Sequence, residues 1–185
     1  MQTSKQISES RLLQAAANGD KQAFGTLYKQ YLDEIYRFIR YKISDDLVAE
    51  DLTEETFFKT WMSLPKIYKK NKKIDNFRAW LYRTAKNLTI DYYRKSKPVA
   101  NIEDNIEARK RSPEEIINQK DISEQLTKAI AKLEPKHKDI IILRFVNQLS
   151  HQEVASILEI SESNSRILQY RALKVMKEIL SNEEK

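Results

Sequence analysis

The 185-residue chain contains no cysteine, only two glycines and only four prolines. Without cysteine, the protein can form neither a disulfide framework nor a thiolate metal site. Glycine and proline interrupt helices, and their scarcity predicts an almost wholly helical, all-α protein. No hydrophobic run approaches the ~20 residues that a membrane-spanning helix needs, and the polar N-terminus does not resemble a signal segment. We therefore expect a soluble, cytoplasmic protein without membrane insertion.

The charge that is present is unevenly distributed along the chain. The net charge is +6, with a pI near 9.3, which suits a polyanionic partner. Residues 45–58 contain six acidic residues and no basic residue, whereas residues 66–97 contain eleven basic residues against two acidic ones. Such segregation indicates two surfaces that meet two different partners.

The helical patterns divide the chain into two small helical domains joined by a flexible linker. The N-terminal domain (8–97) is expected to contain four helices, at Glu9–Asn18, from Asp20 to Ile43, at Asp45–Leu64 and at Phe77–Lys97. Their expected boundaries include N-caps at Ser44 and Asn76 and a helix stop at Pro65. Residues 98–112 lack periodicity and are interpreted as the linker. A capped helix start at Ser112 and Pro113 then opens the C-terminal domain (113–182).

Two helix-start signals follow one another in the C-terminal domain and predict a helix-turn-helix. Ser150 and Glu153 form a capping-box pattern before a short apolar segment, and Ser161 precedes a longer helix from Glu162 to Leu180. On that second helix, Leu168, Ala172, Val175 and Ile179 share one face, and the opposite face carries Arg166, Ile167, Tyr170, Lys174 and Lys177. A helix that enters a DNA groove needs both faces. The alternative is an amphipathic helix with a solvated basic face.

The predicted third helix has an apolar face and an acidic face. Its expected core positions are Ala49, Leu52, Thr53, Thr56, Phe57, Thr60 and Leu64. Leu47, Phe58 and Met62 lie among the acidic residues of the opposite arc, and a protein interface often mixes apolar and charged side chains in this way. Metal binding by the carboxylates is a weaker alternative, because no histidine accompanies them.

The predicted fourth helix interleaves basic and aromatic residues opposite its core stripe, which consists of Phe77, Leu81, Thr84, Ala85, Leu88 and Tyr92. The other side is expected to display Tyr82, Arg83, Lys86, Asn87, Tyr93 and Arg94, with Trp80 at its margin. Cations that follow phosphates and rings that stack on bases suit single-stranded nucleic acid. The alternative is that Trp80 and Tyr82 belong to the core and that the lysines only aid solubility.

The order of these motifs resembles that of bacterial sigma-70-family factors. Segments similar to sigma regions 2.2 to 2.4 are Ala49–Phe57, Phe77–Leu88 and Asp91–Arg94, and segments similar to region 4 are Leu133–Pro135, Leu149–Ser150 and Leu168–Leu173. No segment resembles region 1.1 or a full region 3, which is typical of the extracytoplasmic-function (ECF) subgroup. The chain departs from the family at the helix-turn-helix turn, where Glu159 replaces a frequent glycine, and at Glu54, where glutamine is common.

The resemblance implies a role for each surface. The third helix is expected to dock on the β′ clamp helices of core RNA polymerase, through Glu50, Asp51, Glu54, Glu55 and Phe58. The loop Lys66–Asn76 and the fourth helix are expected to open and read the −10 promoter element, with Arg78, Trp80, Arg83, Lys86, Asn87, Tyr93 and Arg94. Region 4 is expected to contact the β flap and to read the −35 element, with Ser163, Asn164, Arg166, Tyr170, Arg171 and Lys174. An anti-sigma factor is a further expected partner.

The sequence thus predicts a transcription initiation factor that uses no catalytic residue, metal or cofactor and is not an enzyme. Two alternatives make different demands. A one-component regulator with an N-terminal sensing domain requires an apolar pocket within residues 8–97. A carboxylate-dependent nuclease requires metal-dependent cleavage.

Overall fold

All regular secondary structure in the computed structural model is helical within the residues it describes, which are 2–43, 45–70, 72–96 and 117–183. The all-α prediction is confirmed. The predicted linker at 98–112 and the helix start predicted at Ser112 and Pro113 lie outside the described residues.

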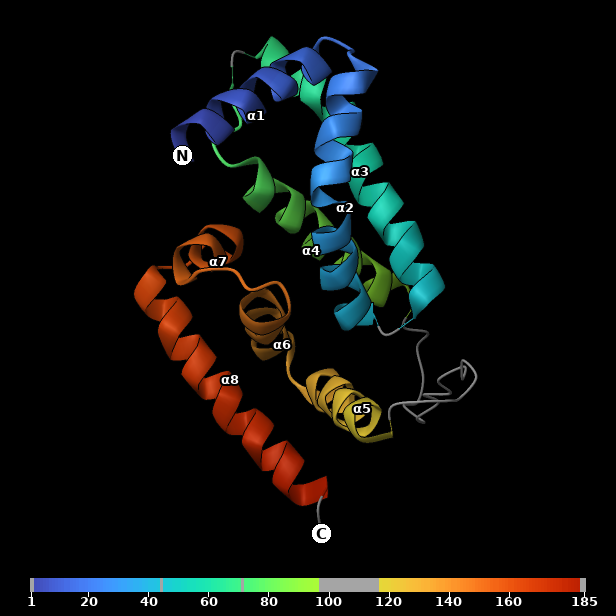
Figure 1. The fold of residues 1–185 in the computed structure, drawn as a ribbon, viewed down its shortest axis with the longest axis vertical. Coiled ribbons are helices and arrows are strands. Elements are labelled where there is room, and N and C mark those ends of the chain that lie inside the picture. The colour runs from blue at the N-terminus through green and yellow to red at the C-terminus, as the bar shows by residue number, and fades with distance from the viewer. Residues whose placement is uncertain (1, 44, 71, 97–116, 184–185) are drawn as a thin grey trace.

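The N-terminal half is built around one central helix. Helix α2 (Lys21–Ile43) contacts α1 (Gln2–Ala17), α3 (Asp46–Lys69) and α4 (Phe77–Ser96). Figure 1 shows α3 and α4 running along α2, with α1 crossing at one end. The apolar residues Leu27, Ile35 and Ile39 of α2 lie within the core. Phe38 joins them, fully buried against Tyr82 in an edge-to-face ring contact with centroids 5.2 Å apart.

The turn between α1 and α2 uses one of the two glycines. Gly19 has a φ of +95°, a conformation that side chains with a Cβ rarely adopt, and its amide donates to the Ala16 carbonyl at 3.0 Å. Asp20 then caps α2, since its carboxylate accepts from the amides of Gln22 and Ala23. Helix α1 is longer than predicted and begins at Gln2.

Both predicted boundaries of α3 are wrong. Asp45, and not Ser44, is the N-cap: its carboxylate accepts from the Val48 amide at 3.1 Å. The helix also continues through Pro65 to Lys69. A proline inside a helix costs about 3 kcal/mol. Here the next turn is held by packing, because Leu64 is fully buried and Tyr68 packs against the core, so tertiary contacts outweigh the local penalty.

The C-terminal half consists of α5 (Ile117–Lys132), α6 (Pro135–Ile141), a π-helical segment η1 (Ile142–Val146), α7 (His151–Leu158) and α8 (Glu162–Glu183). Helix α8 is the organising element and contacts α5, α6 and α7. The core of this half includes Ile130, Ile140, Leu143, Val154 and Ala172, all buried. The predicted helix-turn-helix is confirmed as α7, a turn and α8.

The two halves are docked against each other. Helix α4 contacts α7, and α2 contacts α5 and η1. In Figure 1, α6 and α7 lie toward α4, while α8 forms the outer edge of the C-terminal half. Across the described ranges, no helix is both long enough and apolar enough to cross a membrane.

Candidate nucleic-acid interface

The turn between α7 and α8 is fixed by caps on both sides. Ser150 caps α7 in a complete capping box, with the Glu153 carboxylate accepting from the Ser150 amide at 2.7 Å. Ser161 caps α8, since its hydroxyl accepts from the Asn164 amide at 3.1 Å. Between them, Glu159 adopts a left-handed conformation with a φ of 57° and a ψ of 44°. The turn therefore forms without the glycine that is frequent at this position in the family.

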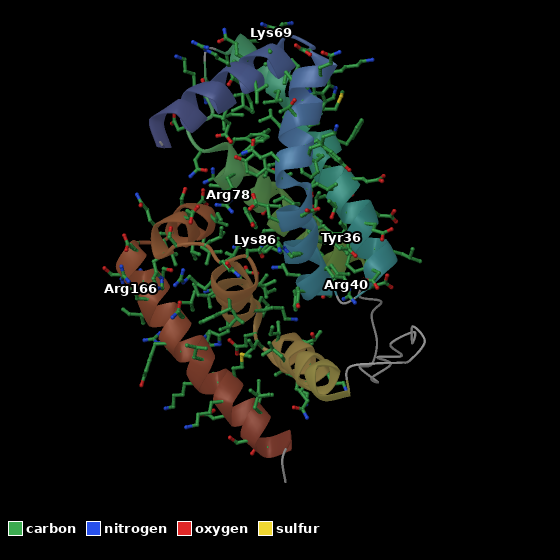
Figure 2. The ribbon with its side chains drawn as sticks, in the orientation of Figure 1. Tyr36, Arg40, Lys69, Arg78, Lys86 and Arg166 are labelled. Carbon is green, nitrogen blue, oxygen red and sulfur yellow. The ribbon has the colours of Figure 1, made fainter. Side chains whose placement is uncertain are left out.

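Helix α8 presents its basic side to solvent. All six predicted DNA-binding residues of this helix are exposed: Ser163, Asn164, Arg166, Tyr170, Arg171 and Lys174. Tyr170 is 73% exposed and Ile167 is 49% exposed, although both are large and apolar or aromatic. Figure 2 shows Arg166 at the outer edge of the molecule, and its guanidinium pairs with Glu162 one turn earlier. The exposed face of α8 is therefore basic, as a helix that enters a DNA groove requires.

Two polar contacts hold α8 in place behind this surface. His151 Nδ1 lies 2.9 Å from the hydroxyl of Ser165, which is fully buried on α8. Burial, together with the charges of Arg144 and Arg166, lowers the pKa of His151 more than Glu162 raises it. Arg144 of η1 donates to Gln169 of α8 at 2.9 Å and also to the Leu149 carbonyl. None of these bracing contacts was predicted, because they join residues whose separate patterns are unremarkable.

The basic side of α4 faces the C-terminal half rather than open solvent. Arg78 Nε donates to the carboxylate of Glu34 on α2 at 3.0 and 3.1 Å, and its Nη1 donates to Glu153 on α7 at 2.5 Å. One turn further, Arg83 Nη1 lies 3.2 Å from Glu159. Lys86 Nζ lies 3.6 Å from Asp139 on α6. Figure 2 shows Arg78 and Lys86 between α4 and the C-terminal helices.

These contacts shift the titration of the groups involved. Burial raises the pKa of Glu153, but hydrogen bonds from Ser150 and the nearby Arg78 outweigh it, so the pKa lies below its usual value. Burial lowers the pKa of Arg78, but Glu34 and Glu153 outweigh it, so the pKa lies above its ordinary value. Both groups therefore remain charged near neutral pH, and their attraction persists.

The remaining predicted residues of α4 lie elsewhere on the helix. Trp80 and Asn87 line a hollow of about 280 Å³ between α3 and α4, together with Lys59, Ser63, Thr84, Leu88 and Asp91. Tyr93 is 43% exposed, and its hydroxyl donates to the Lys42 carbonyl at 2.5 Å. Arg94 is exposed and pairs with Asp91 at 3.1 Å. The seven residues thus divide between an engaged side and an open side of α4.

The predicted position of Tyr82 is wrong. It was expected on the displayed side of the fourth helix, but it is fully buried and packs on Phe38. Burial, the largest cause, raises its pKa far above the usual tyrosine value. A helical wheel places Tyr82 between Arg78 and Lys86, and only the presence of α2 over this arc makes it part of the core. Trp80 is half-buried and contacts Phe77.

The acidic face of α3 matches its prediction closely. Glu50, Asp51, Glu54, Glu55 and Phe58 are all exposed, and the seven predicted core positions of this helix are all buried. Leu47, Phe58 and Met62 are 71%, 63% and 51% exposed. Apolar side chains left in solvent among carboxylates indicate a protein interface.

An apolar hollow adjoins the acidic face. It measures about 400 Å³ and is lined by Lys21, Phe24, Tyr28, Glu54, Phe57, Phe58 and Trp61 of α2 and α3. Glu54 and Phe58 belong to both surfaces, so the hollow extends the acidic face. Among the residues that the structure describes, no group of three or more histidine, aspartate or glutamate side chains is placed to hold a metal ion.

Comparison with known proteins identifies the family of this chain. Residues 27–98 match the sequence profile of sigma-70 region 2, and residues 123–176 match that of sigma-70 region 4. The ECF RNA polymerase sigma factor SigW of Bacillus subtilis is 32% identical over 154 residues, which cover 77% of this chain and 80% of SigW. The chain belongs to the ECF subgroup of the sigma-70 family.

Other relatives agree with this assignment. The ECF RNA polymerase sigma factor BldN of Streptomyces coelicolor is 32% identical over 176 residues, or 93% of this chain and 66% of BldN. Two solved structures share the fold at lower identity. CnrH, in complex with the cytosolic domain of CnrY, has a TM-score of 0.69 at 22% identity and covers 95% of this chain and 98% of its own. RpoE of Bartonella quintana, in complex with the anti-sigma factor NepR, has a TM-score of 0.63 at 21% identity and covers 85% of this chain and 96% of its own.

Two residues of this sigma factor were missed by the sequence analysis. Lys42 of α2 and Asp139 of α6 are 6% and 3% exposed and form a buried ion pair across the two halves. The Lys42 ammonium also lies 5.3 Å from the centre of the Phe38 ring. A charged residue at a core position of an amphipathic helix is the only sequence signal that points to either residue.

Proposed function

We propose that this sigma factor directs core RNA polymerase to promoters and helps to open them, with its surfaces divided by partner. In this proposal residues 8–97 bind the polymerase and the −10 element, and residues 113–182 bind the −35 element and the β flap. The observation that carries the proposal is the exposure, in one chain, of an acidic and apolar face on α3 and a basic face on α8. It acts by binding and not by catalysis, in the cytoplasm where bacterial RNA polymerase works.

The α3 face is the proposed contact with the β′ clamp helices. Its carboxylates require a basic partner, and its apolar residues, continued by the hollow at Phe24, Tyr28 and Trp61, require an apolar centre. Interfaces place such apolar anchors centrally and charges at the rim, where charges mainly steer association.

The α8 face is the proposed −35 contact. Arg166 and Asn164 lie in the first turns of the helix, where residues of a recognition helix reach base edges, whereas Lys174 lies two turns further along. Trp80, Asn87 and Tyr93 offer rings and an amide to the displaced −10 strand, which suits stacking on unpaired bases. An anti-sigma factor is a proposed regulator, supported by the RpoE–NepR complex of similar fold.

In vitro transcription with purified core polymerase, with and without this chain, tests the function. Promoter-specific transcripts are expected only when the chain is present. A one-component regulator would instead bind operator DNA without changing the start-site choice of core polymerase, and a nuclease would degrade the template.

Charge reversal tests the assignment of α3. We expect Asp51→Lys with Glu55→Lys to weaken core binding about tenfold or more, most strongly at low salt, because like charges would meet the basic partner. The matched control is Asp33→Lys with Glu178→Lys, which makes the same charge change at exposed positions of α2 and α8. Equal core affinity for the two double variants would remove the α3 face from the interface.

A further inference from the structure

One imidazole bridges the two helices of the helix-turn-helix. His151 is the first residue of α7, and its Nδ1 lies 2.9 Å from the hydroxyl of Ser165 on α8. Ser165 is fully buried, whereas His151 is half-buried. Figure 1 shows α7 and the first turns of α8 meeting at one end of the C-terminal half. The imidazole therefore lies beside the first turns of the helix that carries the proposed −35 contact.

The contact with Ser165 accommodates both protonation states of the imidazole. A serine hydroxyl can donate to a neutral Nδ1 and can accept from a protonated one, so the ring can gain a proton without losing this hydrogen bond. Within the described residues Nδ1 is the ring nitrogen that makes a hydrogen bond, which leaves Nε2 for solvent or a ligand. His151 can thus change its charge while α8 stays in place.

The charges around His151 favour its neutral form in the free chain. Arg144 approaches from η1 and Arg166 from α8, and the Glu162 carboxylate opposes them while it is itself paired with Arg166. The charged side chains of α4 that reach α7 pair with carboxylates of α7, as Arg78–Glu153 and Arg83–Glu159. Burial and the two guanidinium groups outweigh Glu162, so the pKa of His151 lies below its ordinary value of 6.5. The ring is therefore mostly neutral at pH 7 and above.

DNA bound to α8 would reverse this balance. In a helix-turn-helix the second helix enters the major groove while the first crosses the sugar–phosphate backbone, and helix N-termini are frequent phosphate contacts. His151 stands at the N-terminus of that first helix. A nearby phosphate favours the protonated form of an imidazole, and it also offsets the charge of Arg166. The same ring is thus driven toward opposite charge states in the free and the bound chain.

We propose that His151 couples DNA binding by α8 to the uptake of one proton, so that the chain binds −35 DNA more tightly as the pH falls below neutrality. The proposal rests on the proposed −35 function of α8. The proton comes from solvent, and the imidazolium then donates its Nε2–H to a backbone phosphate. Because the pKa of His151 is higher in the complex than in the free chain, affinity rises as the pH falls through the bound value and levels off below the free value.

Equilibrium binding by the full chain tests the proposal. The probe is a short fluorescent duplex that the chain itself enriches from a randomised pool, and fluorescence anisotropy is measured at constant ionic strength. The unsubstituted chain should bind this duplex roughly fivefold more tightly at about pH 6 than at about pH 8, since a rise of about one pKa unit on binding limits the effect to tenfold.

Two substitutions at position 151 separate protonation from structure. His151→Asn keeps a polar atom near the position of Nδ1 but cannot be protonated, so its affinity should stay at the weaker, high-pH level throughout. His151→Lys is charged over the whole range and should lose the pH dependence at the tighter level. The matched control is His137→Asn on α6, because it removes the other of the two histidines and should leave the pH dependence intact.

Proton NMR observes the titration directly on the unsubstituted chain. Two histidines give two imidazole Hε1 signals, and His137→Asn assigns them. The titration midpoint of His151 should rise by about one pH unit when the chain is saturated with the duplex, which matches the affinity change. An unchanged midpoint overturns the proposal even if the variants at position 151 fail to fold. A pH dependence of affinity that persists in folded His151→Asn also overturns it.

Failure of the proposed function has a different signature. A chain that enriches no duplex from the pool at any pH contradicts the −35 assignment of α8, and the proton linkage falls with it. A chain that enriches a duplex and binds it equally at each pH keeps the −35 function and loses only the role of His151.

Discussion

Glu159 holds a left-handed backbone conformation at the turn between α7 and α8, and glycine should hold it better. A residue with a Cβ is destabilised by about 1–2 kcal/mol in the left-handed region of backbone conformation. Replacing Glu159 with glycine removes that strain but also removes the contact with Arg83 at 3.2 Å. Comparing Glu159→Gly with Glu159→Ala removes the ion pair from the calculation, because both variants lose it.

The expected difference follows from two opposing terms. Glycine relieves about 1–2 kcal/mol of strain in the folded state. It also gives the unfolded chain more freedom, which costs about 0.4–1 kcal/mol relative to alanine. The glycine variant should therefore be more stable than the alanine variant by about 0.5–1 kcal/mol, and a difference of about 1 kcal/mol raises the Tm of a 60–100-residue domain by roughly 4–8 °C.

Position 178 in α8 supplies the matched comparison. Glu178 is exposed in a regular helix, where the alanine variant should be more stable than the glycine variant by about 0.8–1 kcal/mol. Urea unfolding followed by circular dichroism, with amide exchange of α7 and α8 to assign the transition, measures all four variants. If alanine is the more stable residue at both positions, the turn carries no strain and the reasoning fails.

Three further predictions concern the DNA surfaces and the α7 cap. Arg166→Ala should weaken binding to matched −35 DNA by roughly 1–3 kcal/mol and binding to scrambled DNA only slightly, and equal losses on both sequences would exclude a base contact. Lys174→Ala should weaken binding to both sequences and lower the slope of log affinity against log salt concentration by about 0.9. Arg83→Ala should reduce the yield of open complexes on duplex promoters, and a pre-melted −10 bubble should restore that yield. Tyr93→Ala should reduce the yield on both templates. Normal open-complex yields for both variants on both templates would exclude α4 from promoter opening. Because the folded-state pKa of Glu153 lies below its usual value of 4.5, its stabilising contribution is present above that value and is lost as the pH falls through the folded pKa. Glu153→Gln should therefore flatten the loss of stability below about pH 4.5 in acid titrations followed by circular dichroism, and an unchanged acid limb would contradict the assignment.

Helical periodicity predicted the faces of single helices well. The buried positions of α3, from Ala49 to Leu64, and the exposed basic positions of α8 follow from which residues recur at helical spacing. Periodicity failed where a second element decides the outcome. Pro65 continues a helix because packing of the following turn outweighs a local penalty, and Tyr82 is buried because α2 covers its arc.

The sequence carries only a weak signal for the docking of the two halves. A charged residue at a core position of a helix suggests a buried partner, but Lys42 and Asp139 are 97 positions apart and nothing in the sequence pairs them. Only the pairing of α2 with η1 and of α4 with α7 brings their charges together. The −10 set was accordingly predicted as one open surface, and the structure divides it between a side that faces the C-terminal half and a side that faces solvent.

The two oxygens of Glu153 serve different neighbours, and this limits which residues can evolve at position 153. Oε2 accepts from the Ser150 amide and hydroxyl at 2.7 and 2.8 Å, while Oε1 accepts from Arg78. Aspartate is too short to span both, and glutamine keeps the cap but loses the charge. Among related chains, glutamine at this position should therefore appear together with the loss of a cation at position 78, so that natural variation links the start of the DNA-binding motif to a residue 75 positions away.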